Sequence, residues 1–546
     1  MKRGSSIIAI FLVLVMIFSA CGKTETAAET STGGGAEEAA ATEAGKVQEI
    51  GELEENYSGD AETNVLSDET LRVILDEEPS SMAPQYSIPS SPGMTVGGCI
   101  FDRLFRWNPE TKEADPCLAT DYEWVDDTHL RLTLRDGVIA HDGTVMTAED
   151  VLYTIEYGQS GTNTMWATYF DLEGTVVEDD LHIVLALNKA VPTMVDQLTG
   201  PSYGIVDKSS VEAAGGIEAS AKAATIGYGP YTFDSWVPGQ YIRLVRHDDY
   251  WDADNVAYYK YIDFTWNADS STRSMAIQSG DGDVTFNLSA MQLNNLSAVD
   301  GVSVYGTSAD AVLCMYINCS AEPLDNELVR DAIDLALDRE TLVQLCYGGL
   351  VEPCETSISP VNKYYSAPDN PSSCNIEAAK QLLAEAGYPD GIDIDMMFIQ
   401  KNTSVAQMVQ SQLEQAGIRL SIVQTEFIAM MGTVCSGDYQ IYMTDISSDD
   451  MATLITRLDG RLSTQEAVGG CQFNDDGLNA LIDIASYDLD EDERREALAG
   501  IQDFVREHHP LVGICCEIKS TAFRSDLVGV SFDVANFPDV SRVRPR

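Results

Sequence analysis

The chain has 546 residues, 44% of them hydrophobic, and it carries 87 acidic against 33 basic side chains for a net charge of −54. This length exceeds what one hydrophobic core supports, and it predicts two or three domains. The negative charge excludes nucleic-acid binding because phosphates would be repelled, and it is explained by solubility or, alternatively, by a preference for cationic ligands.

The first 20 residues have the pattern of a secretory signal peptide. Lys2 and Arg3 precede twelve apolar residues, Ile7 to Phe18, and small residues lead to Cys21. Twelve residues are fewer than the about 20 that span a bilayer, so the run is typical of a signal rather than a membrane helix. The stretch before Cys21 resembles a bacterial lipobox, which implies cleavage and lipidation of Cys21. An uncleaved signal anchor is the alternative.

Residues 21–64 are predicted to be the lipidated cysteine followed by a disordered acidic tether. Residues 22–64 contain eleven acids, two lysines and almost no aromatic side chains. Such a segment cannot bury enough apolar surface to offset its ordering entropy. The protein is therefore expected on the extracytoplasmic face of the cell membrane, held by its lipid.

Strands and hairpins dominate the next part of the chain. The alternation of apolar and polar residues predicts a strand at 71–75, hairpins at 122–136 and 176–187, and strands at 231–236 and 241–246. A helix is expected around residues 99–107. Thr147 is expected to cap a second helix that has acids in its first turn.

From residue 326 helices alternate with strands. Helical spacing covers residues 328–337, 375–386, 403–416 and 491–507, and strands are expected at 393–399 and 419–424. This order predicts an α/β arrangement of strand–helix units. Residues 523–534 return to strand character.

Cysteines and histidines do not form a recognisable metal or redox motif. Eleven cysteines remain after Cys21, an odd number that cannot pair fully, and no C-x-x-C occurs. We expect mostly free, buried thiols, with Cys314 and Cys319 as the nearest candidates for a bridge. His508 and His509 are expected at a helix end, and His141 in a turn. No cofactor and no metal site are predicted.

Two further motifs have ordinary explanations. Residues 200–204 spell G-x-S-x-G around Ser202, but the strand–turn–helix context of a hydrolase is missing, so a loop is expected. Asp475-Asp476-Gly477 is expected to be a turn, and the acids of residues 488–496 are expected to start a helix.

Seven stretches together carry a family resemblance. In chain order they are residues 115–124 (DPCLATDYEW), 134–138 (LRDGV), 141–144 (HDGT), 147–151 (TAEDV), 227–231 (GYGPY), 329–339 (VRDAIDLALDR) and 382–388 (LLAEAGY). In this order the chain resembles the solute-binding proteins of ABC importers in the peptide- and nickel-binding class, family 5 of the bacterial extracellular solute-binding proteins.

The resemblance implies an α/β fold of the periplasmic-binding-protein type, with two lobes, a hinge, a ligand cleft and an extra inserted domain. Lobe I would contain residues 65–105, 226–311 and 521–546, the inserted domain residues 106–225, and lobe II residues 312–520.

The same resemblance implies where a ligand's ammonium would bind. Peptide-binding relatives place an aspartate in the segment that corresponds to residues 442–451 here. Asp445, Asp449 and Asp450 are therefore the candidate partners of a ligand ammonium. A solvated acidic loop is the alternative.

The remaining site residues follow from two other segments. Lys401 stands just after the strand at 393–399, where dipeptide-binding relatives carry an arginine for the ligand carboxylate, and a lysine offers a point charge in place of a planar fork. The loop with Glu78, Ser80 and Ser81 resembles the first-lobe loop that approaches the ligand backbone.

The predicted function is that of a non-enzymatic, monomeric, lipid-anchored receptor that binds short peptides and delivers them to an ABC permease. A nickel chelate, heme or an oligosaccharide is the alternative ligand within the family. A secreted serine hydrolase using Ser202, or an adhesion protein without cleft function, is the alternative of another class.

Overall fold

The computed structural model describes residues 66–83, 85–86, 91–108, 111, 113–161, 165–217, 226–447, 451–488, 490–533 and 537–546. The predicted signal peptide, Cys21 and the tether lie outside these ranges. Among the described helices, none combines the length and the apolar composition that crossing a bilayer requires.

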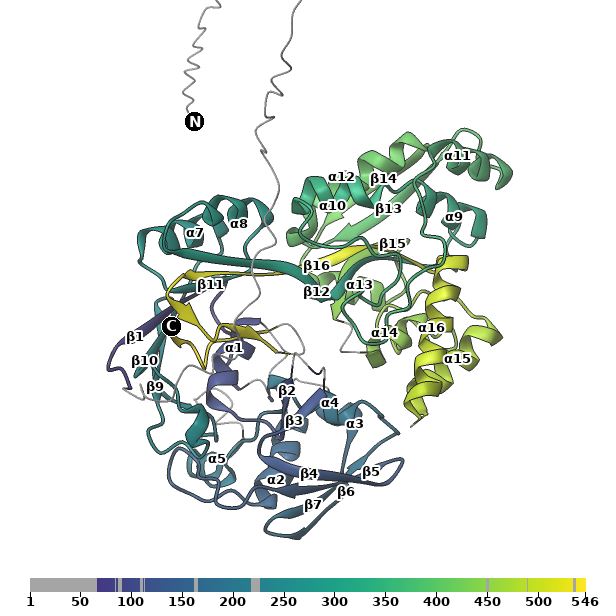
Figure 1. Ribbon diagram of the computed structural model, residues 1–546. Coiled ribbons are helices and arrows are strands. Elements are labelled where there is room, and N and C mark those ends of the chain that lie inside the picture. The colour runs from purple at the N-terminus through teal and green to yellow at the C-terminus, as the bar shows by residue number, and fades with distance from the viewer. Residues whose placement is uncertain are drawn as a thin grey trace, which may run out of the picture. The chain divides into compact units, whose positions relative to one another are not determined.

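One ten-stranded mixed sheet forms the frame of the structure (Figure 1), with the strand order β14-β13-β15-β12-β16-β11-β1-β10-β9-β8. Its strands are β1 (Thr70–Leu75), β8 (Tyr231–Val237), β9 (Tyr241–Arg246), β10 (Tyr261–Trp266), β11 (Val284–Phe286), β12 (Val302–Ile317), β13 (Ile392–Phe398), β14 (Ile418–Gln424), β15 (Ile441–Ser447) and β16 (Leu511–Arg524).

The two longest strands, β12 and β16, connect the two ends of this sheet. They pair antiparallel from Val302 opposite Arg524 to Tyr316 opposite Leu511, and the register is irregular between Ser308 and Val312. From Val312 to Ile317, β12 is buried on both faces. In Figure 1 both strands run from the elements around β11 to the elements around β15, so each strand belongs to both groups.

The buried side chains form three large hydrophobic cores. We call the parts around them lobe I (core residues from 71–101, 231–286 and 523–543), the insert (104–205 and 228) and lobe II (312–516). Four side chains of the segment between residues 106 and 225 pack into the lobe I core: Tyr153, Tyr157, Val206 and Val211. The domain boundaries predicted at 311/312 and 520/521 fall inside β12 and β16, which continue across them.

The insert contains a separate four-stranded sheet with the order β4-β5-β7-β6. These strands are β4 (Ala119–Asp126), β5 (His129–Leu134), β6 (Phe170–Asp179) and β7 (His182–Leu187). The helices are α2 (Ala148–Gln159), α3 (Met165–Tyr169), α4 (Met194–Gln197) and α5 (Lys208–Ala213). At the start of α2 the Asp150 carboxylate accepts a hydrogen bond from the backbone N–H of Thr147 at 2.8 Å, which completes the predicted cap.

Helices cover the large sheet in both lobes. In lobe I they are α1 (Ser91–Ile100), α7 (Ser270–Ser279) and α8 (Ala290–Ser297). In lobe II they are α9 (Glu327–Leu335), α10 (Arg339–Tyr347), α11 (Ile376–Glu385), α12 (Thr403–Gln415), α13 (Phe427–Cys435), α14 (Met451–Leu458), α15 (Asp476–Tyr487) and α16 (Glu491–His508). Short strands complete the fold: β2 (Phe105–Asn108), β3 (Glu113–Pro116), β17 (Leu527–Val528), β18 (Ser531–Phe532), β19 (Pro538–Asp539) and β20 (Arg544–Pro545).

Most elements predicted from periodicity are confirmed, and two are wrong. The helix expected at residues 99–107 is instead α1, which ends at Ile100, and residues 105–108 form β2. The turn expected at residues 475–477 is the start of α15, where the Asp475 carboxylate accepts from the N–H groups of Gly477 and Leu478. The α/β fold is confirmed.

All eleven cysteines in the described ranges are free thiols, and seven of them are buried. This confirms the expectation of free, buried thiols. Cys314 and Cys319 remain unbridged.

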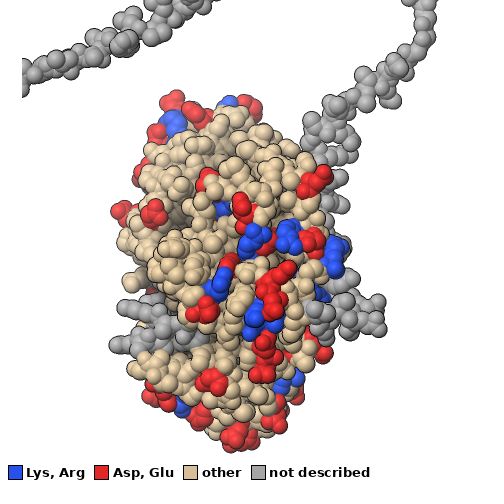
Figure 2. Space-filling view, turned by 90° about the vertical axis from the view of Figure 1, so that its left-hand side faces the viewer, with Lys and Arg blue, Asp and Glu red and all other residues tan. Residues whose placement is uncertain are grey.

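Ion pairs cross the outer side of lobe I. Examples are Arg243 with Asp263, at 2.6 Å between Nε and Oδ1, and Arg72 with Asp283, at 2.7 Å between Nη2 and Oδ1. Figure 2, which faces the side where β1, β9 and β10 lie, shows basic and acidic side chains next to one another along a band. The positive charge of these arginines is thus neutralised locally, on a protein that is acidic as a whole.

Candidate ligand-binding site

Three charged side chains from separate segments of lobe II meet beside β12. Lys401 lies in a 3₁₀ turn (Gln400–Asn402) after β13, Asp445 lies on β15 and Glu517 on β16. The Lys401 ammonium is 2.7 Å from Asp445 Oδ1 and 3.7 Å from Glu517 Oε1. We call these residues the charged cluster. The structure therefore brings together two residues predicted for the site and a third that was not predicted.

The cluster holds more acid than base. The pKa of Glu517 is raised to about 7, mainly by burial. The positive charge of Lys401 lowers this pKa, and the negative charge of Asp445 raises it. Burial lowers the pKa of Lys401, but the two carboxylates outweigh this and hold it above its usual value. Among the described residues, Glu517 Oε1 is buried without a hydrogen-bond donor. Glu517 Oε1 is therefore an acceptor whose hydrogen-bonding capacity is unused.

Glu517 lies where the two connecting strands are irregular. Its neighbours Cys516 and Ile518 pair with Val312 and Ser308, so the bulge in β12 stands opposite Glu517. Asp310, inside that bulge, accepts a hydrogen bond from the Asn362 side chain at 2.8 Å. Glu517 therefore lies at the irregular part of β12 and β16, the only two strands of the described sheet that connect lobe I with lobe II.

The loop predicted from lobe I is engaged locally. Glu78 Oε1 accepts hydrogen bonds from the Trp236 indole at 3.0 Å and from the Gly239 N–H at 3.1 Å, which ties the loop to the β8–β9 hairpin. Ser81 Oγ accepts from the Ala83 N–H, and Ser80 is exposed. Asp449, Asp450 and Cys21 lie outside the described residues.

Ser202 and His141 have structural contacts. Ser202 is buried in a 3₁₀ turn (Pro201–Tyr203), and its hydroxyl donates to Met94 Sδ at 3.7 Å. His141 Nε2 contacts the Gly229 carbonyl oxygen at 3.0 Å, and burial lowers the pKa of His141 to about 4, so the neutral ring links residues 141–144 to residues 227–231. His509 caps the end of α16, as predicted. In the described ranges no group of three or more His, Cys, Asp or Glu side chains could hold a metal ion.

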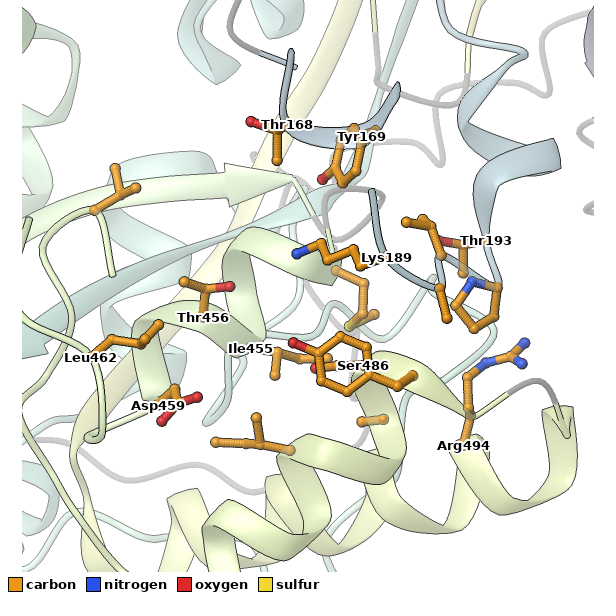
Figure 3. A pocket seen from close by; sticks show the side chains of 18 of the residues that line it. Thr168, Tyr169, Lys189, Thr193, Ile455, Thr456, Asp459, Leu462, Ser486 and Arg494 are labelled. Atoms are coloured by element: carbon orange, nitrogen blue, oxygen red, sulfur yellow. The ribbon is translucent and has the colours of Figure 1, made fainter. Parts of the chain in front are cut away.

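A cavity of about 480 Å³ lies between the insert and lobe II. The insert contributes α3 and the loop after β7, and lobe II contributes α14, α15 and the start of α16. Figure 3 shows Lys189 extending from the insert into this space, toward Thr456 of α14. Met451, the first residue of α14, lines this cavity and stands six positions after Asp445 in the sequence.

Sequence reasoning missed Glu517 and Lys189. Glu517 is one acid inside the apolar run of β16, and a lone charge in a buried strand is the available signal for it. Lys189 lies in an irregular loop and has no motif around it.

Comparison with known proteins places the chain among binding proteins. Residues 113–461 match the family described as bacterial extracellular solute-binding proteins, family 5 Middle. The glutathione-binding protein GsiB of Pectobacterium atrosepticum is 24% identical over 351 residues, which cover 62% of this chain and 66% of that protein. The matched part thus spans slightly less than two thirds of that relative.

Solved structures share the fold. A dipeptide-binding protein from a Pseudoalteromonas species, in complex with Met-Leu, is 20% identical with a TM-score of 0.75, covering 88% of this chain and 100% of that one. NikA from Brucella suis, in complex with Fe(III)-EDTA, is 18% identical with a TM-score of 0.78 and the same coverage. Members of the matched family are solute-binding proteins and not enzymes, in agreement with the contacts of Ser202. The chain belongs to family 5 of the bacterial extracellular solute-binding proteins.

Proposed function

We propose that this protein is the lipid-anchored, extracytoplasmic substrate-binding component of an ABC importer, and that its ligand is a short peptide. Family membership supports the binding role, and the named relatives and structures include glutathione-binding and dipeptide-binding proteins. Both named ligands are short peptides with a free ammonium and free carboxylates. The permease partner and the monomeric state belong to the same proposal.

The charged cluster is the observation that carries the peptide assignment. A peptide ammonium needs carboxylate partners when it leaves water. Asp445 and Glu517 offer two carboxylates against one ammonium, that of Lys401. The ligand ammonium would bind between these carboxylates, while Lys401 keeps them together in the unliganded protein.

A role for Lys401 in binding the ligand carboxylate stays a prediction. Its ammonium already lies 2.7 Å from Asp445, so a ligand carboxylate would have to compete with this acid and with Glu517. This geometry favours the ammonium end of a peptide at the cluster over its carboxylate end.

Binding is proposed to close the two lobes by bending at β12 and β16. The irregular register between Ser308 and Val312 is a local weakness in an otherwise continuous ladder. Closure excludes water and strengthens the interaction between the ligand ammonium and the two carboxylates. The ligand shifts the population toward the closed form to the extent that it binds the closed form more tightly than the open form.

The lipid anchor follows from the sequence around Cys21 and from the acidic segment after it. Cys21→Ala in the full chain is expected to release the protein from the membrane fraction of the producing cell, or to leave it with an uncleaved signal. Unchanged membrane attachment together with an unlipidated wild-type Cys21 in mass spectrometry would remove the anchor from the proposal.

The ligand is tested by native mass spectrometry of the protein without its first 64 residues, followed by identification of the released molecules. A set of peptide masses is expected. A single metal chelate, heme or oligosaccharide mass would overturn the peptide assignment and keep the importer role. If no molecule is released, isothermal titration with a di- to hexapeptide panel decides, and a panel without binding overturns the peptide assignment.

A further inference from the structure

The cavity between the insert and lobe II has the size and lining of a ligand site. Its volume of about 480 Å³ falls within the roughly 300–1,000 Å³ typical of small-molecule pockets. Its apolar lining comes from both sides, with Met165 and Val191 on the insert and Met451, Ile455 and Ile482 on lobe II. An apolar side chain of a ligand would find contacts on both walls.

The acidic residues of the lining are already engaged. Asp459 accepts hydrogen bonds from Arg461, with 2.8 Å between Nε and Oδ1. Glu466 Oε2 accepts from the Ser463 hydroxyl at 2.7 Å and from the Ser463 N–H at 3.0 Å. Both carboxylates therefore have donors without any ligand.

The two cations of the lining differ. Arg494 is buried and donates to the Asp488 carbonyl oxygen and the Tyr364 hydroxyl. The Lys189 ammonium lies over the Tyr169 ring, 6.0 Å from its centroid. Figure 3 shows Lys189 reaching into the cavity beside Tyr169. Lys189 is thus the charge that the cavity offers to a ligand, and it selects for an anionic group.

We propose that this cavity is a second ligand subsite that receives the C-terminal residue of an oligopeptide. The terminal carboxylate binds Lys189 Nζ, and an apolar C-terminal side chain packs against Ile455 and Ile482. This inference rests on the proposed function, because it places the ammonium end of the same peptide at the charged cluster.

The chain connection limits the length of such a peptide. Met451, which lines the cavity, stands six positions after Asp445. Six residues span at most about 20 Å, so the near wall of the cavity lies within that distance of the charged cluster. An extended peptide of about six residues covers the same span. A peptide of up to about six residues is therefore long enough to reach from the charged cluster into the cavity.

The test measures affinities by isothermal titration for Ala-Ala-Ala-Ala-Leu as the free acid and as the C-terminal amide. The wild-type protein is expected to bind the free acid at least tenfold more tightly. Lys189→Met is expected to abolish this difference and to leave the affinity for the amide within about twofold. Lys208→Met is the matched control, because it removes a lysine of the insert that pairs with Glu149 outside the cavity. It is expected to keep the tenfold difference.

A second variant fills the cavity without changing its charge. Ser486→Trp is expected to weaken the pentapeptide acid at least tenfold while the affinity for the dipeptide Ala-Leu stays within about twofold.

Each outcome separates the subsite from the proposed function. If the wild-type protein does not distinguish acid from amide, or if Lys189→Met keeps the full difference, the subsite is wrong while peptide binding stands. If the wild-type protein binds neither the pentapeptides nor Ala-Leu, the peptide assignment itself fails, and the subsite fails with it.

Discussion

Lys363 of lobe II and Asp196 on α4 of the insert form an ion pair, with 3.0 Å between Nζ and Oδ2. Both side chains are 28% exposed. Burial lowers the pKa of Lys363, but the charge of Asp196 outweighs this and raises the pKa overall. The carbonyl oxygen of Lys363 also accepts a hydrogen bond from Arg495 of α16. The pair therefore links the insert to lobe II near the cavity that these two parts share.

Lys363→Met is expected to weaken this link. A partly exposed pair contributes about 0.2–1 kcal/mol, so ligand affinity should fall up to about fivefold, and the ligand-free protein should sample more extended forms. Titration calorimetry and small-angle scattering measure the two effects. Lys380→Met, which removes an exposed pair with Glu377 on α11, should change neither. Equal affinity and equal radius of gyration for both variants would contradict a linking role.

Glu517→Gln is expected to remove a pH dependence. Because burial raises its pKa to about 7 from 4.5, the folded protein holds the proton more tightly than the unfolded chain, and the free energy of unfolding falls as pH rises from about 4.5 through 7. The variant should lose this decline and be more stable at mildly alkaline pH, by on the order of 1–2 kcal/mol. Urea unfolding across this range measures it. Parallel curves for both proteins would show that Glu517 does not titrate there.

The same substitution tests the ammonium site. In the wild-type protein, peptide affinity should rise as Glu517 ionises near pH 7, because the new charge attracts the ligand ammonium. Glu517→Gln should remove this rise and bind more weakly at pH 8, by about tenfold. Titration calorimetry at several pH values decides. A wild-type affinity that is independent of pH between 6 and 8 would place the ammonium elsewhere.

His509 is expected to stabilise the protein at neutral pH. Burial lowers its pKa, but hydrogen bonds and charges of Asp331 and Asp334 outweigh this and raise it to about 9 from 6.5. The folded state therefore binds the proton more tightly, and this stabilisation is complete below pH 6.5 and lost as pH rises through 9. His509→Asn suits the left-handed backbone at this position, where φ is 48°, and should lower stability at pH 6 by up to about 3 kcal/mol. The difference in the free energy of unfolding between the two proteins, measured by urea unfolding, should vanish above pH 9. A difference that stays constant with pH would contradict the stabilising role of the His509 proton.

Gly513→Ala is expected to destabilise the structure at β16. An added Cβ would lie 2.7 Å from the Cys354 carbonyl oxygen and 2.7 Å from the Thr356 nitrogen, both backbone atoms that cannot turn aside. Overpacking of this kind costs about 1–3 kcal/mol. Gly432→Ala is the matched control, because no atom lies within 4 Å of its added Cβ in α13, and it should stabilise by about 0.5–1 kcal/mol. Thermal unfolding of both variants measures the contrast, and equal shifts would refute the close approach.

The sequence predicts the elements that bury one face. In the insert, β5 and β7 alternate because one side of each contacts the insert core. Helix α16 shows helical spacing because one side of it packs into the lobe II core. The connecting strands β12 and β16 were missed because long parts of them are buried on both faces, so their residues do not alternate. The helix at 99–107 was misplaced because α1 contains three glycines and a proline, which have low helix propensity. Tertiary packing overrides this low propensity in the folded protein.

The site shows the same division. Asp445 and Lys401 were found through resemblance to a family, and the structure brings them together. Their mutual ion pair was not predicted, because local sequence does not report which strands become neighbours. Glu517 reaches this cluster because β16 pairs with β12, and these two segments are about 200 residues apart in the chain. Such a member of a site has no local pattern to reveal it.

The position of β16 also sets an order of assembly. During synthesis, β11 and β12 are complete long before residues 511–524 emerge, yet β16 is the strand that lies between them. Until then each has one sheet edge without its native neighbour, and unpaired edges favour association with other chains. A nascent or truncated chain ending before residue 511 would be prone to aggregate, and a ligand could not rescue it through Glu517, because that carboxylate arrives on the same late strand.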